Sequence, residues 1–124
     1  MLRLQFLTTR LAVCRLDPHA PVPSWATGAF VAIIRTNEEL SVVCEEDAVP
    51  EGTRCEPGWR AFRVAGTLDF GLTGVLARLT APLAEAGIPV FALSTFDTDY
   101  VLVRTHHVTE AVRALRVAGF TVET

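Results

Sequence analysis

Two carboxylates stand two residues apart in the stretch Thr95, Phe96, Asp97, Thr98 and Asp99. Carboxylates at this spacing can receive a cationic side chain through charge-assisted hydrogen bonds, and a phenyl ring beside them can cover the alkyl stem of such a ligand. Alternatively, Asp97 and Thr98 form an Asx turn or a hydroxyl turn that closes a hairpin, which needs no ligand. On chemistry alone the turn is the favoured interpretation.

A second candidate site precedes a segment with helical apolar spacing, and its residues are Asp69, Phe70, Gly71, Leu72, Thr73 and Gly74. Backbone amides at a helix start can hold an anion such as the α-carboxylate of an amino acid. The pattern is neither GxGxxG nor GxxxxGK[ST], however. From spacing alone we therefore favour an ordinary turn from strand to helix, in which the two glycines supply conformational freedom.

The residues that could support catalysis or bind a metal are poorly placed for either. His106 and His107 are sequence neighbours, which point apart on a strand, and neither a cysteine nor an acid stands at metal-ligand spacing from them. Cys44 lies in an apolar strand, where burial raises the pKa of a thiol. We predict a protein that is not an enzyme and has no cofactor and no metal.

Composition sets the broad class. The chain has 124 residues, of which 50% are hydrophobic, so it can bury a core without disulfides or a metal. The cysteines at 14, 44 and 55 form no CxxC pair, and their odd number cannot be fully paired within one chain, so we expect buried thiols in a reducing compartment. Lysine is absent, which excludes a Schiff base on a lysine side chain.

Charge and hydropathy limit the possible partners. The net charge is -3 and no basic face is evident, so nucleic acid is not an expected partner. The longest apolar run, residues 29–34, is far shorter than the ~20 residues of a membrane span, and the first seven residues do not form a signal peptide. We expect a soluble, cytoplasmic protein that does not enter the membrane.

Apolar periodicity predicts a series of strands and helices. Strands at 2–7 and 11–16 either pair as a hairpin or flank a turn, and a proline-rich stretch follows that cannot be a long helix. Further strands are expected at 29–35, 40–44, 59–68, 88–94, 99–103 and 120–122, with a loop at 53–58 and helices at 73–87 and 108–118. Asp69 or Thr73 is the expected cap of the first helix, and Gly87 its expected stop.

A weak internal repeat divides the chain. A shift of 59 positions superimposes the hairpin at 29–44 on the hairpin at 88–103. The proline-rich stretch then stands where the second copy has its first helix. We predict an α+β fold with two β-α-β-β-α-β halves, built as antiparallel sheets with helices on one face. The expected halves are residues 1–58, which are degenerate, and residues 59–124.

The segments that follow resemble a known family: 68–70 and 72–74, 82–84 with 87–88, 94–100 with 102–103, and upstream 35–44 and 58–60. They are similar to the ACT domains of the group that contains the cytosolic arginine sensors and small bacterial tandem proteins. The resemblance implies ferredoxin-like halves. It also implies that the loop at 69–74 and the strand start at Ile88, Pro89 and Val90 hold the polar ends of an amino-acid ligand, with the segment 95–99 near it.

The expected function follows from this resemblance. It is a non-catalytic, small-molecule-binding regulatory protein, an allosteric amino-acid sensor that holds its ligand at an ACT–ACT interface. The arginine sensors resemble two such units fused in one chain, so a homodimer is expected, with a regulated protein as a further partner. One alternative is a ligand-free oligomerising structural or adaptor module. A small hydrolase built around Cys44 is a third, weaker alternative.

Overall fold

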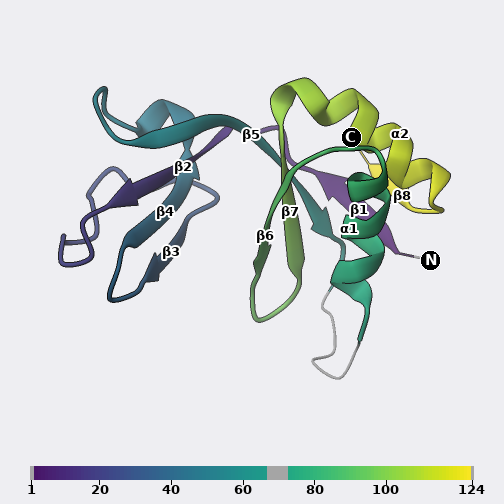
Figure 1. Ribbon diagram of the computed structural model, residues 1–124, viewed down its shortest axis with the longest axis horizontal. Coiled ribbons are helices and arrows are strands. Elements are labelled where there is room, and N and C mark those ends of the chain that lie inside the picture. The colour runs from purple at the N-terminus through teal and green to yellow at the C-terminus, as the bar shows by residue number, and fades with distance from the viewer. Residues whose placement is uncertain (1, 67–72, 124) are drawn as a thin grey trace. The chain divides into compact units, whose positions relative to one another are not determined.

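The structure, a computed structural model, describes residues 2–66 and 73–123. Their contacts divide the chain into two units, one made of residues 9–59 and the other of residues 1–8 together with 60–124 (Figure 1). Strand β5 (Cys55–Val64) gives its first half to one unit and its second half to the other. Among the described residues, no helix has the length and apolar character needed to cross a membrane.

The unit of residues 9–59 is an antiparallel sheet with the strand order β3-β4-β2-β5. Its elements are β2 (Leu11–Leu16), β3 (Ala32–Arg35), β4 (Leu40–Glu45), the short 3-10 helix η1 (Glu46–Ala48) and the start of β5. Ala20 of the proline-rich stretch, residues 17–23, packs against the buried cluster of β2 and β4 side chains, as do Trp25 and Ala26 just after it. This segment stands where the other half of the repeat has its first helix. It covers one face of the sheet without being helical, because apolar side chains exclude water in any backbone conformation.

The unit of residues 1–8 and 60–124 has the strand order β8-β1-β5-β7-β6. Its further elements are β1 (Arg3–Phe6), α1 (Val75–Glu85), β6 (Val90–Ser94), β7 (Asp99–Arg104), η2 (Thr105–His107), α2 (Val108–Val117) and β8 (Thr121–Glu123). One buried cluster joins both helices to the sheet. It contains Leu79 and Leu83 of α1, Ala111 and Leu115 of α2, and strand residues that include Leu4, Phe62, Val64, Val101 and Val103. The predicted α+β class and ferredoxin-like halves are confirmed.

The repeat predicted from the sequence is visible in the register of the two hairpins. Arg35 pairs with Leu40 between β3 and β4, and Ser94 pairs with Asp99 between β6 and β7, which is the same pair shifted by 59 positions. The 3-10 helices at 46–48 and 105–107 obey the same shift. Both halves therefore follow the same path from hairpin to short helix, although only the second continues into a long one.

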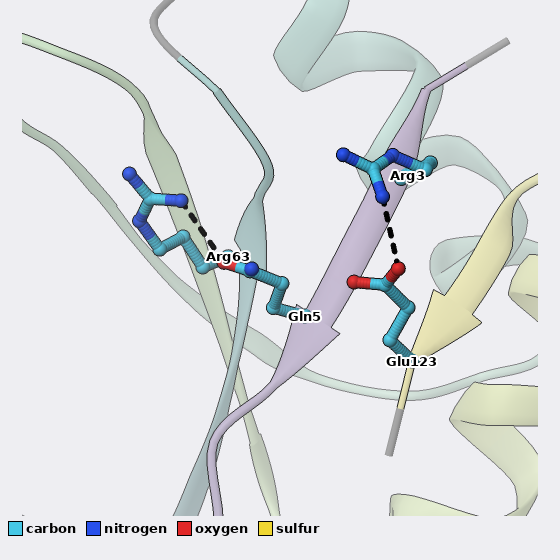
Figure 2. A network of polar contacts seen from close by, with 4 residues as sticks. All are labelled: Arg3, Gln5, Arg63 and Glu123. Carbon is cyan, nitrogen blue, oxygen red and sulfur yellow. Dashed lines mark hydrogen bonds and ion pairs between the residues drawn. The ribbon is translucent and has the colours of Figure 1, made fainter.

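The two strands near the N-terminus flank a turn and do not pair with each other. β1 pairs antiparallel with β5 and parallel with β8, whereas β2 pairs with β4 and with β5. Side chains reinforce the position of β1, since Arg3 forms an ion pair with Glu123 at 3.0 Å and Gln5 accepts a hydrogen bond from Arg63 at 3.0 Å (Figure 2). Residues 1–8 therefore group with residues 60–124, which differs from the expected division at 58/59.

Strand β5 begins earlier than expected. The segment 53–58 was predicted as a loop because Pro57 and Gly58 are poor strand residues, yet the strand starts at Cys55. Leu11 of β2 is opposite Trp59 while Val13 is opposite Glu56, so the register shifts here. Gly58 has φ +81 and donates its N–H to the Glu46 carboxylate at 2.7 Å. A β-bulge thus accommodates the two residues that made the segment look like a loop.

Candidate ligand-binding site

The start of helix α1 is set by a glycine. Gly74 is the N-cap residue, with φ +76 and ψ 1, in the left-handed region that L side chains avoid. A Cβ at this position would meet no atom within 4 Å, so backbone conformation and not space requires the glycine. Gly74 replaces the cap expected from Thr73, which is exposed and precedes it. A glycine has no side-chain oxygen that could accept hydrogen bonds from the N–H groups of the first helical turn. These N–H groups can therefore face an anion.

The end of helix α1 is as predicted. Gly87 has φ +73, its N–H donates to the Ala84 carbonyl at 3.0 Å, and the next N–H, of Ile88, donates to the Leu83 carbonyl at 2.9 Å. These two bonds make a Schellman motif. Ile88 is 3% exposed and joins the same buried cluster as Leu83, which fixes the direction in which the chain enters β6.

The turn between β6 and β7 is closed by a hydroxyl. The Thr95 N–H donates to the Thr98 carbonyl at 2.8 Å, and the Thr98 N–H donates to Thr95 Oγ1 at 3.2 Å. Thr36 makes the same contacts with Glu39 in the turn between β3 and β4. The turn expected from the sequence is present, but Thr95 closes it in place of Asp97.

Thr98 connects this turn to the end of β5. Its side chain is 3% exposed, and its hydroxyl donates to the Val64 carbonyl at 2.8 Å. The turn of residues 95–98 therefore lies beside the last residues of β5. The first turn of α1 lies at the same end of this unit, the lower end in Figure 1. Two of the stretches proposed from the sequence, 73–74 and 95–99, are thus at one end of one unit.

The two acids of the turn have different surroundings. Asp99 is half-buried and accepts a hydrogen bond from the Ser94 hydroxyl at 2.6 Å, across the pair that closes the β6–β7 hairpin. Asp97 is exposed at the tip of the turn, next to Phe96, whose side chain is 78% exposed. Asp97 is consequently the carboxylate better placed to meet a solute.

The remaining residues of the expected site lie elsewhere. Val90 pairs with Val103 at the far end of β6 from Ser94, which at the usual rise per residue is roughly 14 Å away. Ile88 is buried and Pro89 is exposed at that far end. A single small ligand on one chain cannot touch both ends of β6. Asp69, Phe70, Gly71 and Leu72 lie outside the described residues.

Sequence reasoning missed two contributors to this end of the unit. Ser94 holds the Asp99 carboxylate, and the Val64 carbonyl holds Thr98. The first had a detectable signal, since a serine directly opposite an aspartate in a hairpin can hydrogen bond across the strands. The second had none, because any residue supplies a backbone carbonyl.

The surroundings of Cys44, His106 and His107 bear on whether these side chains could support catalysis or bind a metal. Burial, followed by the neighbouring Glu45, raises the pKa of the Cys44 thiol, which lowers its thiolate fraction and so its nucleophilic reactivity. The rings of His106 and His107 lie side by side in η2, with their centroids 4.3 Å apart. Among residues 2–66 and 73–123, no group of three or more His, Cys, Asp or Glu side chains is arranged to hold a metal ion.

From β5 to β8 the order of elements is β-α-β-β-α-β, which is ferredoxin-like, and α1 begins at a glycine. Residues 54–117 match the family model described as ACT domain, and the chain belongs to the ACT domain family. A second model, described as an N-terminal domain, matches residues 9–52. The predicted family is confirmed.

Individual relatives span a wide range of similarity. A crystal structure of protein Atu0741 from Agobacterium tumefaciens is 36% identical, with a TM-score of 0.93 over 98% of this chain and 92% of that chain. The rat protein named cytosolic arginine sensor for mTORC1 subunit 1 is 26% identical over 76% of this chain and 31% of its own length. The regulatory subunit of aspartate kinase from Thermus thermophilus, 12% identical with a TM-score of 0.66 over 94% of this chain and 96% of that chain, shares the fold. This chain spans about a third to a half of the curated relatives it matches.

Proposed function

We propose that this protein is a non-catalytic regulatory protein that binds an amino acid or a similar small metabolite. The observation that carries the proposal is the ACT family match over residues 54–117. The rat relative is named as an arginine sensor, which supports an amino acid as the ligand. We also propose a cytoplasmic location, in line with that relative's name, and a protein partner whose activity the ligand controls.

The proposed ligand position is the end of the unit where α1 begins and the β6–β7 turn lies. The first-turn amides after Gly74 would receive the α-carboxylate, because the partial positive charge of a helix start favours an anion. Asp97, exposed at the tip of the turn, would receive a cationic group, and Phe96 would cover the alkyl stem between them. This arrangement favours arginine or lysine over a neutral amino acid.

We further propose that the ligand binds at an ACT–ACT interface of a homodimer. The chain spans 31% of the length of the rat sensor, so a second copy would supply further ACT units. The strand start at Ile88, Pro89 and Val90 lies at the far end of β6 from the turn, so it would join the site only from another copy. Light scattering on the purified protein at tens of micromolar should give twice the chain mass, and a monomer would rule out this part of the proposal.

Thermal unfolding with each of the twenty amino acids at millimolar concentration tests binding itself. A ligand at 100 times its dissociation constant stabilises the folded state by about 2.7 kcal/mol, which raises the melting temperature by several degrees. We expect arginine or lysine to give the largest rise. If every amino acid leaves the melting temperature unchanged, the amino-acid proposal is wrong.

Calorimetry with arginine and citrulline tests the role of Asp97. The parent should prefer arginine, because a hydrogen bond to a charged group contributes roughly 1.5–3 kcal/mol, and Asp97→Asn should abolish the preference. Glu38→Gln is the matched control, since Glu38 occupies the same place in the β3–β4 turn of the other unit and is exposed as well. An unchanged preference in Asp97→Asn would remove this carboxylate from the site.

A specific observation supports the alternative, a ligand-free oligomerising module. β3 stands at the edge of the sheet in the unit of residues 9–59, and its Ile33 and Ile34 side chains are 37% and 51% exposed. Exposed apolar edge strands are templates for pairing with another chain. Ile34→Glu should then lower the oligomeric state in light scattering, while no amino acid shifts the melting temperature. Ligand binding that survives Ile34→Glu would favour the sensor.

A further inference from the structure

Three thiols gather on one face of the sheet in the unit of residues 9–59. Cys14 comes from β2, Cys44 from β4 and Cys55 from β5, and all three lie in or against the same apolar cluster. All three are free cysteines. Cys14 and Cys44 are buried, whereas Cys55 is half-buried. Reagents in solution therefore reach Cys55 more easily than the other two.

The register of β2 and β5 sets Cys14 directly opposite Cys55. The N–H of the next residue, Arg15, donates to the Arg54 carbonyl at 3.0 Å, so the two cysteines occupy a non-hydrogen-bonded pair of the antiparallel ladder. At such pairs the Cα atoms are about 4.5 Å apart and the side chains are closest. Disulfides need a Cα separation of about 4.4–6.8 Å, so the backbone need not move. Cys55 is also one of the neighbours that raise the pKa of Cys14.

Cys44 is the thiol left out of this pair. It stands opposite Ala12, while the residue of β4 opposite Cys14 is Val42. Its thiol donates to the Glu45 carbonyl at 3.6 Å. The geometry therefore selects one pair from the three possible pairs.

We propose that Cys14 and Cys55 are a dithiol site that forms a reversible cross-strand disulfide with small disulfides such as oxidised glutathione. The Cys55 thiolate attacks one sulfur of oxidised glutathione, a mixed disulfide forms, and one glutathione thiolate leaves. The Cys14 thiolate then attacks the Cys55 sulfur and releases the second glutathione. The two protein thiols together lose two protons and two electrons, and oxidised glutathione becomes two molecules of glutathione.

The surroundings of Cys14 make the second step the slow one. Burial, followed by the neighbouring thiols of Cys55 and Cys44, raises the pKa of Cys14 to about 12. Its thiolate is consequently scarce, and the mixed disulfide on Cys55 accumulates before it resolves. The Cα separation typical of such pairs, about 4.5 Å, lies near the lower limit for a disulfide, so we expect the bond to be readily reduced again. A reversible bond of this kind suits redox sensing more than structural support.

The experiment is incubation of the whole protein with oxidised glutathione, followed by denaturation, alkylation of free thiols and peptide mass mapping. We expect a linked pair of peptides that contain Cys14 and Cys55, with Cys44 alkylated, and full reversal by dithiothreitol. The oxidised protein should melt at a higher temperature than the reduced one. A link that includes Cys44, three alkylated thiols, or a glutathione adduct that never resolves would each overturn the proposal.

Three variants separate the roles. Cys44→Ser is the matched control and should form the same link at the same rate. Cys55→Ser, at a half-buried position, should leave Cys14 unmodified, because the buried thiol has lost its exposed partner. Cys14→Ala should stop at the glutathione adduct on Cys55. Modification of Cys14 in the Cys55→Ser protein would contradict the order of the two steps.

Discussion

A single hydroxyl, that of Thr98, joins the β6–β7 turn to the end of β5. Replacing Thr98 with valine keeps the shape of the side chain and leaves the Val64 carbonyl without this donor. A buried acceptor that loses its partner costs about 1–3 kcal/mol, so Thr98→Val should lower the free energy of unfolding by that amount in urea titrations. Thr109→Val, at an exposed position of α2, is the control and should change it by less than about 0.5 kcal/mol. Equal effects would show that the hydrogen bond contributes nothing.

At this scale the sequence indicated which residues form the turn but not how they are used. Threonine and aspartate compete for the same role in turns, because a hydroxyl and a carboxylate both accept from backbone N–H groups. The stretch 95–99 therefore predicted a turn closed by Asp97 and Thr98, whereas the Thr95 hydroxyl accepts the hydrogen bond that closes it. The contact of Thr98 with Val64 joins residues far apart in the chain, and no local pattern encodes it.

At the scale of elements, the start of α1 depends on a left-handed residue. Gly74→Ala should lower the free energy of unfolding by about 1–2 kcal/mol, because an L side chain at φ +76 is strained even where its Cβ meets no neighbour. Gly74→Asn should cost less, since asparagine tolerates this conformation better than alanine. Urea titration of both variants measures the difference. If alanine and asparagine cost the same, the strain is not in the backbone of residue 74.

The spacing of apolar residues predicted both helices and the later hairpins well, because the residues that form these elements are close together in the sequence. The apolar spacing of residues 75–86 matches the face of α1 that Leu79 and Leu83 bury. The start of β5 was missed because Pro57 and Gly58 usually end strands, and a bulge that admits them depends on the partner strand. The pairing of β1 was also left open, because the alternation of apolar and polar residues predicts a strand but does not indicate which strands lie beside it.

At the scale of the whole molecule, β1 completes the unit in which we propose the ligand site. β1 lies between β5 and β8 in the strand order, and Leu4 on β1 is fully buried. A fragment of residues 59–124 lacks this strand. We expect that fragment to show no cooperative thermal transition by circular dichroism.

A second fragment supplies the control. The Leu7 N–H donates to the Ala61 carbonyl at 2.9 Å, and β1 and β5 are antiparallel, so a two-residue Asn-Gly turn can join residue 8 to residue 60. Residues 1–8 linked in this way to residues 60–124 should unfold cooperatively. Cooperative unfolding of the fragment 59–124 alone would instead support the division at residues 58/59.

The position of β1 also affects how the chain folds during synthesis. Arg3 pairs with Thr121 and Leu4 with Val122, so β1 leaves the ribosome well before β8, one of its two neighbours in the sheet. Contacts this distant in sequence are slow to form, because the intervening chain must first be closed into a loop. Until residues 60–64 and 121–123 have been made, β1 is an unpaired strand whose Leu4 and Phe6 side chains have no core to enter. During that interval an unpaired strand edge is exposed to aggregation.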